Sequence, residues 1–206
     1  MKDKTKIAVL VSGGGTNLQA LIDAEKSGIL KSGEIVLVLS SNLDAYALER
    51  AKKAGIPTAV VTKKQFGGDR EAYENAMIKT LRDAGVELVI LAGFMTILGV
   101  RFIEAYRDRI INVHPALIPS FCGEGFYGLK VHEAALSYGV KVTGATVHFV
   151  NEIPDGGKII AQKAVNIRKN DTPGTLQRRV MEQAEWKILP RAAELVSKQI
   201  QKNKTT

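Results

Sequence analysis

One stretch near the N-terminus decides the fold: Ile7-Ala8-Val9-Leu10-Val11-Ser12-Gly13-Gly14-Gly15-Thr16-Asn17. Its first residues form a short, continuously apolar run, which is typical of a strand buried on both faces of a sheet. A glycine-rich turn follows, and a helical pattern then begins with Leu18, Leu21 and Ile22. A strand, a glycine-rich turn and a helix in this order predict the first unit of an α/β protein.

The same alternation continues toward the middle of the chain. The pattern predicts further strands at 35–39, 57–61, 88–92 and 110–113, and helices at 45–54 and 70–84. Strands that alternate with helices form right-handed βαβ units. We therefore expect a Rossmann-like, mostly parallel twisted sheet with helices on both faces.

Beyond residue 114 the pattern changes. A loop rich in proline and glycine is expected first, then a short helix, an antiparallel C-terminal hairpin with an enlarged tip, and a last helix capped by Asp171 or Thr172. Pro190 should kink this helix or break it in two. The ranges are 115–128, 131–137, 143–150 with 158–165, and 173–199. Nothing marks a linker, so one domain over 1–206 is predicted, with a phosphate-binding half at about 1–105 and a catalytic half at about 106–206.

The composition restricts the class of protein. The net charge of +8 arises from 29 basic and 21 acidic residues, without a dense basic block interleaved with aromatics, so nucleic acid is not the expected partner. One cysteine, Cys122, leaves no internal disulfide and no cysteine cluster for a metal. No apolar run approaches the length of a membrane span, and a cytoplasmic protein is expected.

The glycine-rich turn at 12–17 offers bare backbone N–H groups at the start of a helix, which favours an anion. Its spacing matches neither the dinucleotide pattern nor the P-loop, since no Gly-Lys-Ser/Thr follows. The turn therefore predicts a site for an isolated phosphate. The alternative is a tight turn without a ligand.

Asn112 and His114 end a predicted strand two residues apart, so their side chains project to the same side. With the carboxylate of Asp155, this amide and imidazole suit an acyl-group transfer through a tetrahedral intermediate. Asp155 precedes Gly156 and Gly157, so simple turn chemistry is the alternative for this residue.

Three other residues are candidates of lower interest. Cys122 near His114 invites a nucleophile interpretation, but an amide and a carboxylate suit transfer without a covalent intermediate. His132 is expected to be structural or on the surface. His148, within a strand, is expected to be buried and hydrogen-bonded, with lining of the site as the alternative.

The chain resembles the phosphoribosylglycinamide formyltransferase family, folate-dependent enzymes of purine synthesis. Asn-x-His-Pro with Asp-Gly-Gly is similar to folate formyltransferases generally, and the glycine-rich first turn points to this member. The motifs that carry the resemblance are Ser12-Gly-Gly-Gly-Thr-Asn17, Arg70-Glu-Ala-Tyr73, Leu91-Ala-Gly-Phe-Met95, Asn112-Val-His-Pro115, Gly144-Ala-Thr-Val-His148 and Asp155-Gly-Gly157.

The resemblance implies roles for particular residues. It implies a catalytic set of Asn112, His114 and Asp155. It implies a glycinamide ribonucleotide site of Gly15, Thr16, Asn17, Gly93, Pro115 and Glu185. It implies a folate site of Arg70, Met95, Thr96, Ile97, Leu98, Asn112, Asn151, Glu152, Ile153 and Pro154. The chain departs from the family where Thr96 replaces a frequent Arg, where Ser120 replaces a frequent Lys in a longer loop, and by one residue in the spacing before Glu185.

The implied reaction transfers the formyl group of 10-formyltetrahydrofolate to the amine of phosphoribosylglycinamide, without a metal, in a monomer or homodimer. Asn112 and a protonated His114 would face the formyl oxygen, and Asp155 should raise the pKa of His114. The alternatives are a formyltransferase that acts on methionyl-tRNA or an amino sugar, and a non-catalytic domain that binds a phosphorylated metabolite.

Overall fold

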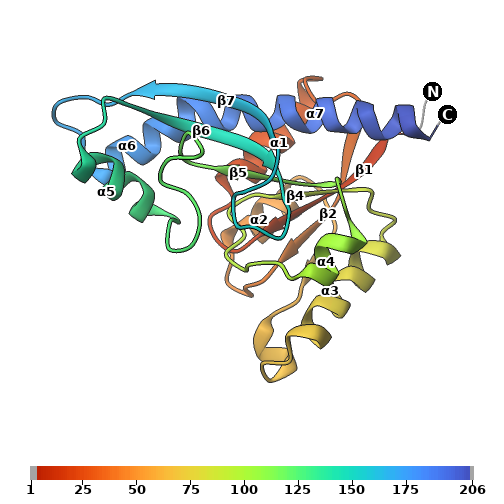
Figure 1. Cartoon of the computed structure of the whole chain (residues 1–206). Helices are drawn as coiled ribbons and strands as arrows, with labels where there is room; N and C mark the ends of the chain where they lie inside the picture. The colour runs from red at the N-terminus through yellow and green to blue at the C-terminus, as the bar shows by residue number, and fades with distance from the viewer. Residues whose placement is uncertain (1–3, 205–206) are drawn as a thin grey trace.

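Seven strands pair side by side in the order β3-β2-β1-β4-β5-β6-β7 in a computed structural model, which describes residues 4–204 (Figure 1). The two ends of the predicted domain, residues 1–3 and 205–206, lie outside the described residues. The strands are β1 (Thr5–Val11), β2 (Gly33–Ser40), β3 (Thr58–Val60), β4 (Leu88–Leu91), β5 (Ile110–His114), β6 (Val142–Phe149) and β7 (Ile159–Asn166). The helices are α1 (Thr16–Lys26), α2 (Tyr46–Lys53), η1 (Lys63–Phe66), α3 (Arg70–Asp83), α4 (Val100–Ala105), α5 (Leu129–Tyr138), α6 (Pro173–Val180), η2 (Met181–Glu185) and α7 (Trp186–Asn203).

The strand directions confirm the expected class of sheet. The pairs β1/β2, β2/β3, β1/β4 and β4/β5 are parallel, whereas β5/β6 and β6/β7 are antiparallel. The strand order reverses between β1 and β4, and open α/β sheets bind ligands at the carboxyl ends of the strands beside such a reversal. The predicted phosphate turn after β1 and the predicted catalytic residues of β5 therefore share one edge of the sheet.

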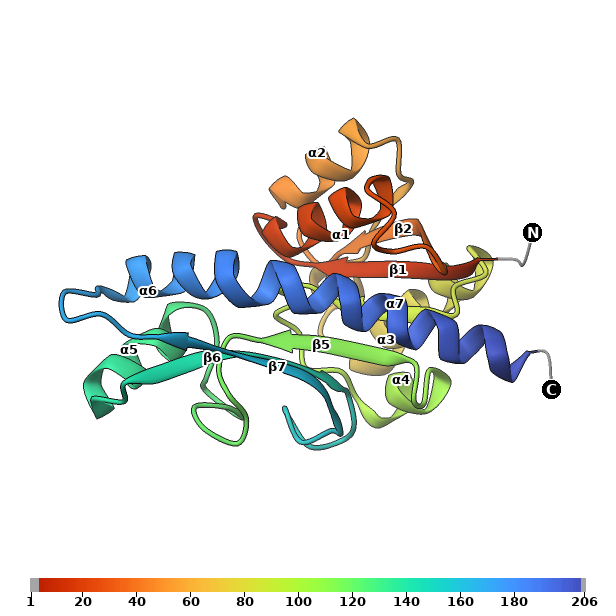
Figure 2. The ribbon, with the colours of Figure 1, turned by 90° about the horizontal axis from the view of Figure 1, so that it is seen from above.

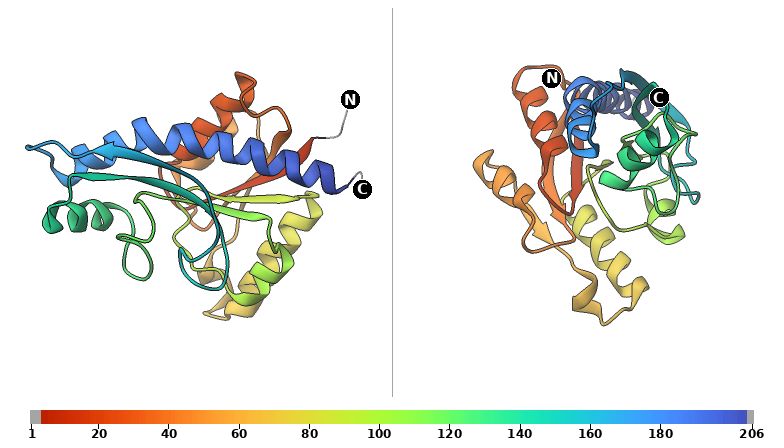
Figure 3. Two further views of the ribbon diagram at one scale, coloured as in Figure 1. Left: turned by 45° about the horizontal axis from the view of Figure 1, so that its top comes forward. Right: turned by 90° about the vertical axis from the view of Figure 1, so that its left-hand side faces the viewer.

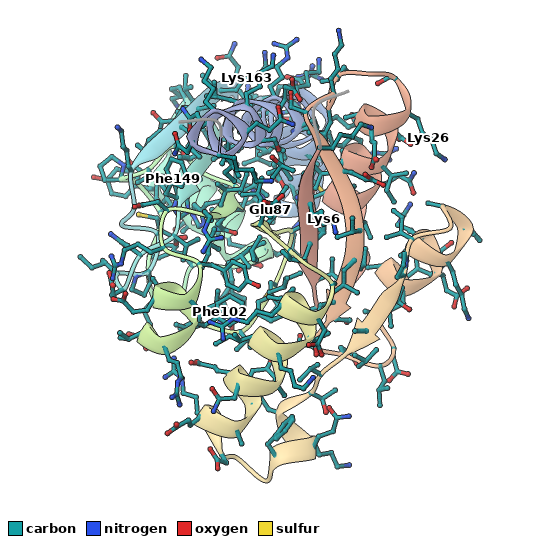
Figure 4. The ribbon with its side chains drawn as sticks, turned by 90° about the vertical axis from the view of Figure 1, so that its right-hand side faces the viewer. Lys6, Lys26, Glu87, Phe102, Phe149 and Lys163 are labelled. Atoms are coloured by element: carbon teal, nitrogen blue, oxygen red, sulfur yellow. The ribbon has the colours of Figure 1, made fainter. Side chains whose placement is uncertain are left out.

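Alternation along β1 divides the apolar core into two layers. Ile7 and Val9 belong to a cluster with side chains of α1, α2 and α7, while Ala8 and Leu10 belong to a cluster with α3 and α4. Figure 3 shows α3 and α4, in yellow and light green, on the opposite side of the sheet from α7, in blue. Phe102 of α4 is fully buried in the second layer (Figure 4). The predicted cover of helices on both faces is confirmed.

The C-terminal helical segment differs from its prediction. α6 and α7 follow one another along the strands as one long segment (Figure 2). α7 continues through Pro190, so of the two predicted outcomes, a kink or a break, the break does not occur. The carbonyl that loses its bond at this proline belongs to Trp186, the first residue of α7, where one missing bond interrupts little. Thr172 is the cap of α6, through its side chain and the backbone N–H of Thr175.

The irregular part of that segment is η2, a stretch of π-helix at Met181–Glu185. A π turn holds one more residue than an α turn, so it accommodates an insertion without rotating the helix on either side. The resemblance predicts a difference of one residue in the spacing before Glu185. A π turn at η2 is a place where such a residue fits.

Two further features concern the element assignments. α4 at Val100–Ala105 is a short helix that the sequence pattern did not indicate, because its few residues carry no clear period. Among residues 4–204, no helix combines the length and the apolar character needed to cross a membrane.

Candidate active site

Asn112, His114, His148 and Asp155 converge at the end of β5. Asp155 Oδ2 lies 3.5 Å from His114 Nδ1, and Asp155 Oδ1 lies 3.5 Å from both Asn112 Nδ2 and His148 Nε2. Antiparallel pairing of β5 with β6 sets Asn112 opposite His148. The β6–β7 connection then returns Asp155 to the same place. The structure thus brings together the three residues predicted to be catalytic, and His148 joins them.

The backbone around Asp155 explains its two glycine neighbours. A Cβ on Gly157 would lie 1.7 Å from the carbonyl oxygen of Phe149, so only glycine allows the chain to return this closely to β6. Asp155 itself has a φ of 55°, in the left-handed region that aspartate tolerates better than most residues. Turn chemistry and a functional carboxylate therefore coincide in this residue.

The loop that follows β5 contacts two of these side chains through its backbone. The carbonyl oxygen of Phe121 lies 2.8 Å from His114 Nε2, and the N–H of Gly123 donates to Asp155 Oδ2 at 2.9 Å. The Phe121 ring packs edge-on against Phe126 and Tyr138, which connects the loop to α5. Sequence reasoning missed both backbone contacts, because a loop conformation leaves no periodic signal.

Those contacts assign the imidazole tautomers. A carbonyl oxygen only accepts hydrogen bonds, so His114 carries a proton on Nε2, toward Phe121. By the same reasoning His148 carries one on Nδ1, which lies 2.8 Å from the carbonyl oxygen of Phe149. His148 Nε2 lies 3.2 Å from Asn112 Nδ2 and 3.5 Å from Asp155 Oδ1, so it accepts from the amide when the ring is neutral and donates to the carboxylate when the ring is protonated. His114 Nδ1 is left facing Asp155 at a distance longer than a charge-assisted hydrogen bond.

Burial lowers the pKa of His114 below 6.5, although the charge of Asp155 and the bond to Phe121 favour its protonated form. Asp155 acts on the His114 pKa in the expected direction, but removal from water outweighs the carboxylate, so the net shift is downward. Burial by itself raises the pKa of Asp155, yet the hydrogen bond to His148, the charge of His114 and the Gly123 N–H bring it below 3.8. The resting site thus holds a carboxylate beside a neutral imidazole with an open Nδ1.

His132 lies in α5 and is fully buried, and its ring nitrogens have no hydrogen-bond partner among the described residues. Burial, with a smaller effect of nearby His114, lowers its pKa to about 4. Its position inside the protein fits the structural interpretation.

Cys122 donates its Sγ–H to the carbonyl oxygen of Pro119, and burial raises the pKa of its thiol. A raised thiol pKa disfavours a nucleophile.

The glycine-rich turn is held in place by α2. Gly15 caps α1 with a φ of 72°, and a Cβ there would lie 2.7 Å from the Cβ of Ala47. The N–H of Ala47 donates to the carbonyl oxygen of Gly13, and Arg50 Nε donates to that of Gly14 at 2.8 Å. With these carbonyl groups bound to α2, the turn keeps a fixed shape at the positive end of the α1 dipole.

Asn17 of α1 and Glu185 of η2 meet although they are far apart in the sequence. Asn17 Nδ2 donates to Glu185 Oε2 at 2.6 Å, and both side chains are buried. Burial raises the pKa of Glu185 to about 7, against the lowering effect of the Asn17 bond. The two residues assigned by resemblance to the phosphate and to the ribose therefore lie in direct contact.

The segment after β4 connects the turn to the rest of the edge. Ser12 Oγ accepts from the N–H of Met95 at 2.9 Å, and Gly93 bends the chain with a φ of 73°. Pro115 directly follows His114 at the end of β5. Gly93 and Pro115 thus lie beside the turn and the catalytic strand, respectively, along the same edge.

The residues predicted to bind folate line two cavities and the hairpin tip. Arg70, Met95, Thr96 and Ile97 line a cavity of about 380 Å³, and Arg70 Nη2 reaches the carbonyl oxygen of Ile97 at 3.4 Å. Arg70 and Ile97 also line a larger space of about 870 Å³ with Leu98 and Glu152.

The remaining residues of that predicted set differ in exposure. The side chain of Leu98 is 8% exposed and packs in the core, so it offers a ligand little more than its backbone. Ile153 is 65% exposed, and its N–H donates to Asn151 Oδ1 at the hairpin tip. Pro154 is exposed beside them.

An amide, an imidazole and a carboxylate gathered at the end of a central strand can assist transfer of a group at a carbonyl carbon. The chain belongs to the formyl transferase family, whose model matches residues 5–193.

Individual relatives agree with this family. The chain is 42% identical over 185 residues to phosphoribosylglycinamide formyltransferase of Haemophilus influenzae, which covers 90% of this chain and 84% of the relative. It is 45% identical over 195 residues to the trifunctional purine biosynthetic protein adenosine-3 of Gallus gallus, covering 95% of this chain but 19% of that protein. The chain thus spans about a fifth of the length of such trifunctional relatives. The crystal structure of glycinamide ribonucleotide transformylase 1 from Symbiobacterium toebii superposes with a TM-score of 0.89 at 39% identity, over 95% of this chain and 89% of that one.

Proposed function

We propose that this formyltransferase moves the formyl group of 10-formyltetrahydrofolate to the amine of 5-phosphoribosylglycinamide, giving the formylglycinamide ribonucleotide and tetrahydrofolate. One observation carries the proposal: the side chains of Asn112 and His114 meet the carboxylate of Asp155. They do so on the sheet edge that also holds the glycine-rich turn. The names of the relatives support the choice of substrate.

The glycine-rich turn and its neighbours bind the ribonucleotide in this proposal. Backbone N–H groups of Gly15, Thr16 and Asn17 at the start of α1 take the phosphate. Glu185 accepts from the ribose hydroxyl groups, which it reaches from beside Asn17. The amine of the substrate then lies toward Gly93 and Pro115, next to the catalytic strand.

Folate lies on the other side of the formyl group. The segment from Met95 to Leu98 contacts the pterin, and the hairpin tip from Asn151 to Pro154 closes over it. Arg70, at the rim of both cavities, attracts the anionic end of folate. Part of its charge is already balanced, because Arg70 Nε donates to the carboxylate of Glu74 at 3.0 Å.

The chemical step starts with attack of the neutral amine on the formyl carbon. A carbon–nitrogen bond forms, and negative charge develops on the formyl oxygen, which accepts from the Asn112 N–H that makes the long contact of 3.5 Å with Asp155 in the free protein. A water held by Asp155 takes the proton of the attacking amine to the open Nδ1 of His114. The resulting imidazolium then stabilises the oxygen at the moment when its charge is greatest.

Collapse of the tetrahedral intermediate breaks the bond between the formyl carbon and the folate nitrogen. The proton on His114 returns through the same water to that nitrogen, so tetrahydrofolate leaves neutral at this position. Asp155 stays a carboxylate throughout, as its lowered pKa requires. A neutral resting His114 is an advantage here, because it accepts a proton before it donates one.

Replacement of the catalytic residues tests this proposal. His114→Ala and Asp155→Asn should each lower kcat by about 10²–10³ while changing the KM of glycinamide ribonucleotide little, because they act on the transition state. Asp108→Asn is the matched control, since Asp108 is also an aspartate with a positive φ, 57°, but is exposed at the opposite end of β5.

The assay measures release of tetrahydrofolate with glycinamide ribonucleotide, and in parallel with methionyl-tRNA. Near-normal turnover in both catalytic variants would contradict the assigned roles. Formylation of methionyl-tRNA instead of the ribonucleotide would overturn the proposed substrate.

A further inference from the structure

A groove of about 490 Å³ lies between α1 and α7, away from the catalytic side chains. Ala20 and Ala24 line it from α1, Trp186 and Pro190 line it from α7, and Ile29 lies at one end. Residues four positions apart form a row along a helix, so each helix gives the groove one apolar wall. Small-molecule sites in proteins have volumes of about 300–1,000 Å³. The groove has the size and the apolar lining of such a site.

The rim of the groove is positively charged. Lys187 and Arg191 form a second row on α7, directly beside the apolar row, and both are exposed. Neither has an ion-pair partner within residues 4–204. The carboxylate of Asp23 on the α1 side already accepts from Gln19 Nε2 at 2.9 Å. Two unpaired cations thus border an apolar floor along the same side.

Arg50 closes the groove near the glycine-rich turn, but its guanidinium is engaged. It donates to the carbonyl oxygen of Gly14 and to Gln19 Oε1, and it lies 5.1 Å from the ring centroid of Tyr46. The charge that remains for a ligand therefore comes from the α7 row.

We propose that this groove is a second binding site, for an anion that carries a flat apolar group, of the aryl carboxylate or aryl sulfonate kind. The ring lies between the alanine row of α1 and Trp186, and the anionic group is held by Lys187 and Arg191. The positive rim favours a ligand with a negative charge, and the apolar walls favour a ligand with an apolar ring. Asn112, His114 and Asp155 do not line the groove, whereas Thr16 of the glycine-rich turn lies at its edge, so the groove adjoins the proposed phosphate site without including the catalytic side chains.

The chain supplies its own reporter for this site. Trp186 is the single tryptophan of the sequence and lines the groove, so energy transfer from one donor reports probe binding, and the variants below locate the bound probe. The probe is 8-anilinonaphthalene-1-sulfonate, an aryl sulfonate whose fluorescence is excited through tryptophan emission. We expect saturable energy transfer with one probe per chain and a Kd of about 10–100 μM.

Two double variants with equal loss of charge test the role of the rim. Lys187→Ala with Arg191→Ala should weaken probe binding about tenfold. Lys163→Ala with Lys169→Ala removes two exposed charges elsewhere and should leave the Kd unchanged. Figure 4 shows that Lys163 on β7 projects from a different part of the surface than Lys26 at the end of α1, the helix that forms one wall of the groove.

A third variant tests the apolar floor. Ala20 is half-buried, and Ala20→Phe fills the groove, so it should abolish the saturable signal. Thermal unfolding curves establish that each variant is folded, and if Ala20→Phe is not, the two charge variants decide alone. Equal Kd values in both double variants would overturn the proposal, as would unchanged binding in folded Ala20→Phe. Weak binding of many probes per chain would mean an adventitious additive only, which also overturns it.

Discussion

Glu185 is a carboxylic acid placed where a carboxylate is unfavourable. Its side chain is buried, and Asn17 supplies one hydrogen bond to it. The other polar atom of Asn17, Oδ1, is buried without a partner among the described residues. A protonated Glu185 has a hydrogen to donate, whereas the ionised form has none. A residue that is kept in such a costly position is a candidate for binding, since function often opposes stability at a site.

The titration of Glu185 makes the stability of the protein depend on pH. Its pKa rises from 4.5 to about 7 on folding, so the folded protein holds this proton more tightly than the unfolded chain. Stability from this group is complete below pH 4.5 and is lost as the pH rises through about 7. The loss reaches about 3 kcal/mol at most, because one unit of pKa corresponds to about 1.4 kcal/mol.

Glu185→Gln removes that titration and keeps the shape. The glutamine amide accepts from Asn17 Nδ2 and donates to Asn17 Oδ1, so the variant should unfold at a higher temperature than the wild type at pH 8 and equally at pH 4.5. The KM of glycinamide ribonucleotide should rise about tenfold, since a hydrogen bond to a charged group is worth about 1.5–3 kcal/mol. Thermal unfolding at both pH values measures the first effect, and steady-state kinetics measure the second. Equal unfolding temperatures at pH 8 would contradict a buried, titrating carboxyl.

Single residues also show where sequence reasoning about the site ends. The two-residue spacing of Asn112 and His114 was sufficient to place both on one side of β5, because a strand alternates. The role of His148 was not accessible in this way. Its position opposite Asn112 depends on the register between β5 and β6, and a shift by one residue would turn it to the other face. The direction in which the His114 pKa shifts depends on how deeply the imidazole is buried, and no sequence motif encodes burial.

At the scale of elements, the strands and most helices were predictable because their apolar patterns are regular. The parallel strands read as continuous apolar runs, and α3 begins within its predicted range, capped by Asp69. The enlarged tip of the β6–β7 hairpin was expected from its glycines. What the pattern did not indicate was η2, because one inserted residue disturbs the helical period without ending the helix.

Two deletions test whether the π turn of η2 accommodates one inserted residue. Removal of Gln183, an exposed residue of η2, should close the π turn into an α turn and keep Glu185 beside Asn17. We expect the KM of glycinamide ribonucleotide to stay within about threefold of the wild type. Removal of the exposed Lys187 is the matched control: it rotates Glu185 by about 100° relative to the core face of α7.

The control deletion should therefore lose ribonucleotide binding even if the π turn closes to restore α6. Isothermal titration with the ribonucleotide, with circular dichroism to verify the helix content, separates the two cases. Equal loss of binding in both deletions would contradict the role of η2 as an insertion.

At the scale of the whole molecule, the net charge of +8 is a property that no single contact explains. Most of the basic residues are exposed, and many of them already form surface ion pairs, which add little to stability. Their combined field acts on approaching ligands. The proposed substrates, a ribonucleotide and a folate, are both anions, so a positive surface should speed their capture.

This field predicts a dependence of catalysis on salt. The screening length is about 8 Å at 0.15 M ionic strength, so kcat/KM should fall about fivefold between about 20 mM and about 300 mM sodium chloride, while kcat stays constant. Lys163→Glu with Lys169→Glu halves the net charge of +8 at exposed positions outside the predicted site, and should flatten this dependence. Rates measured at subsaturating ribonucleotide, over a series of salt concentrations and with sucrose as a viscosity control, test both statements. A salt effect on kcat alone would place the charge in the chemical step instead, because long-range attraction acts before the substrate is bound.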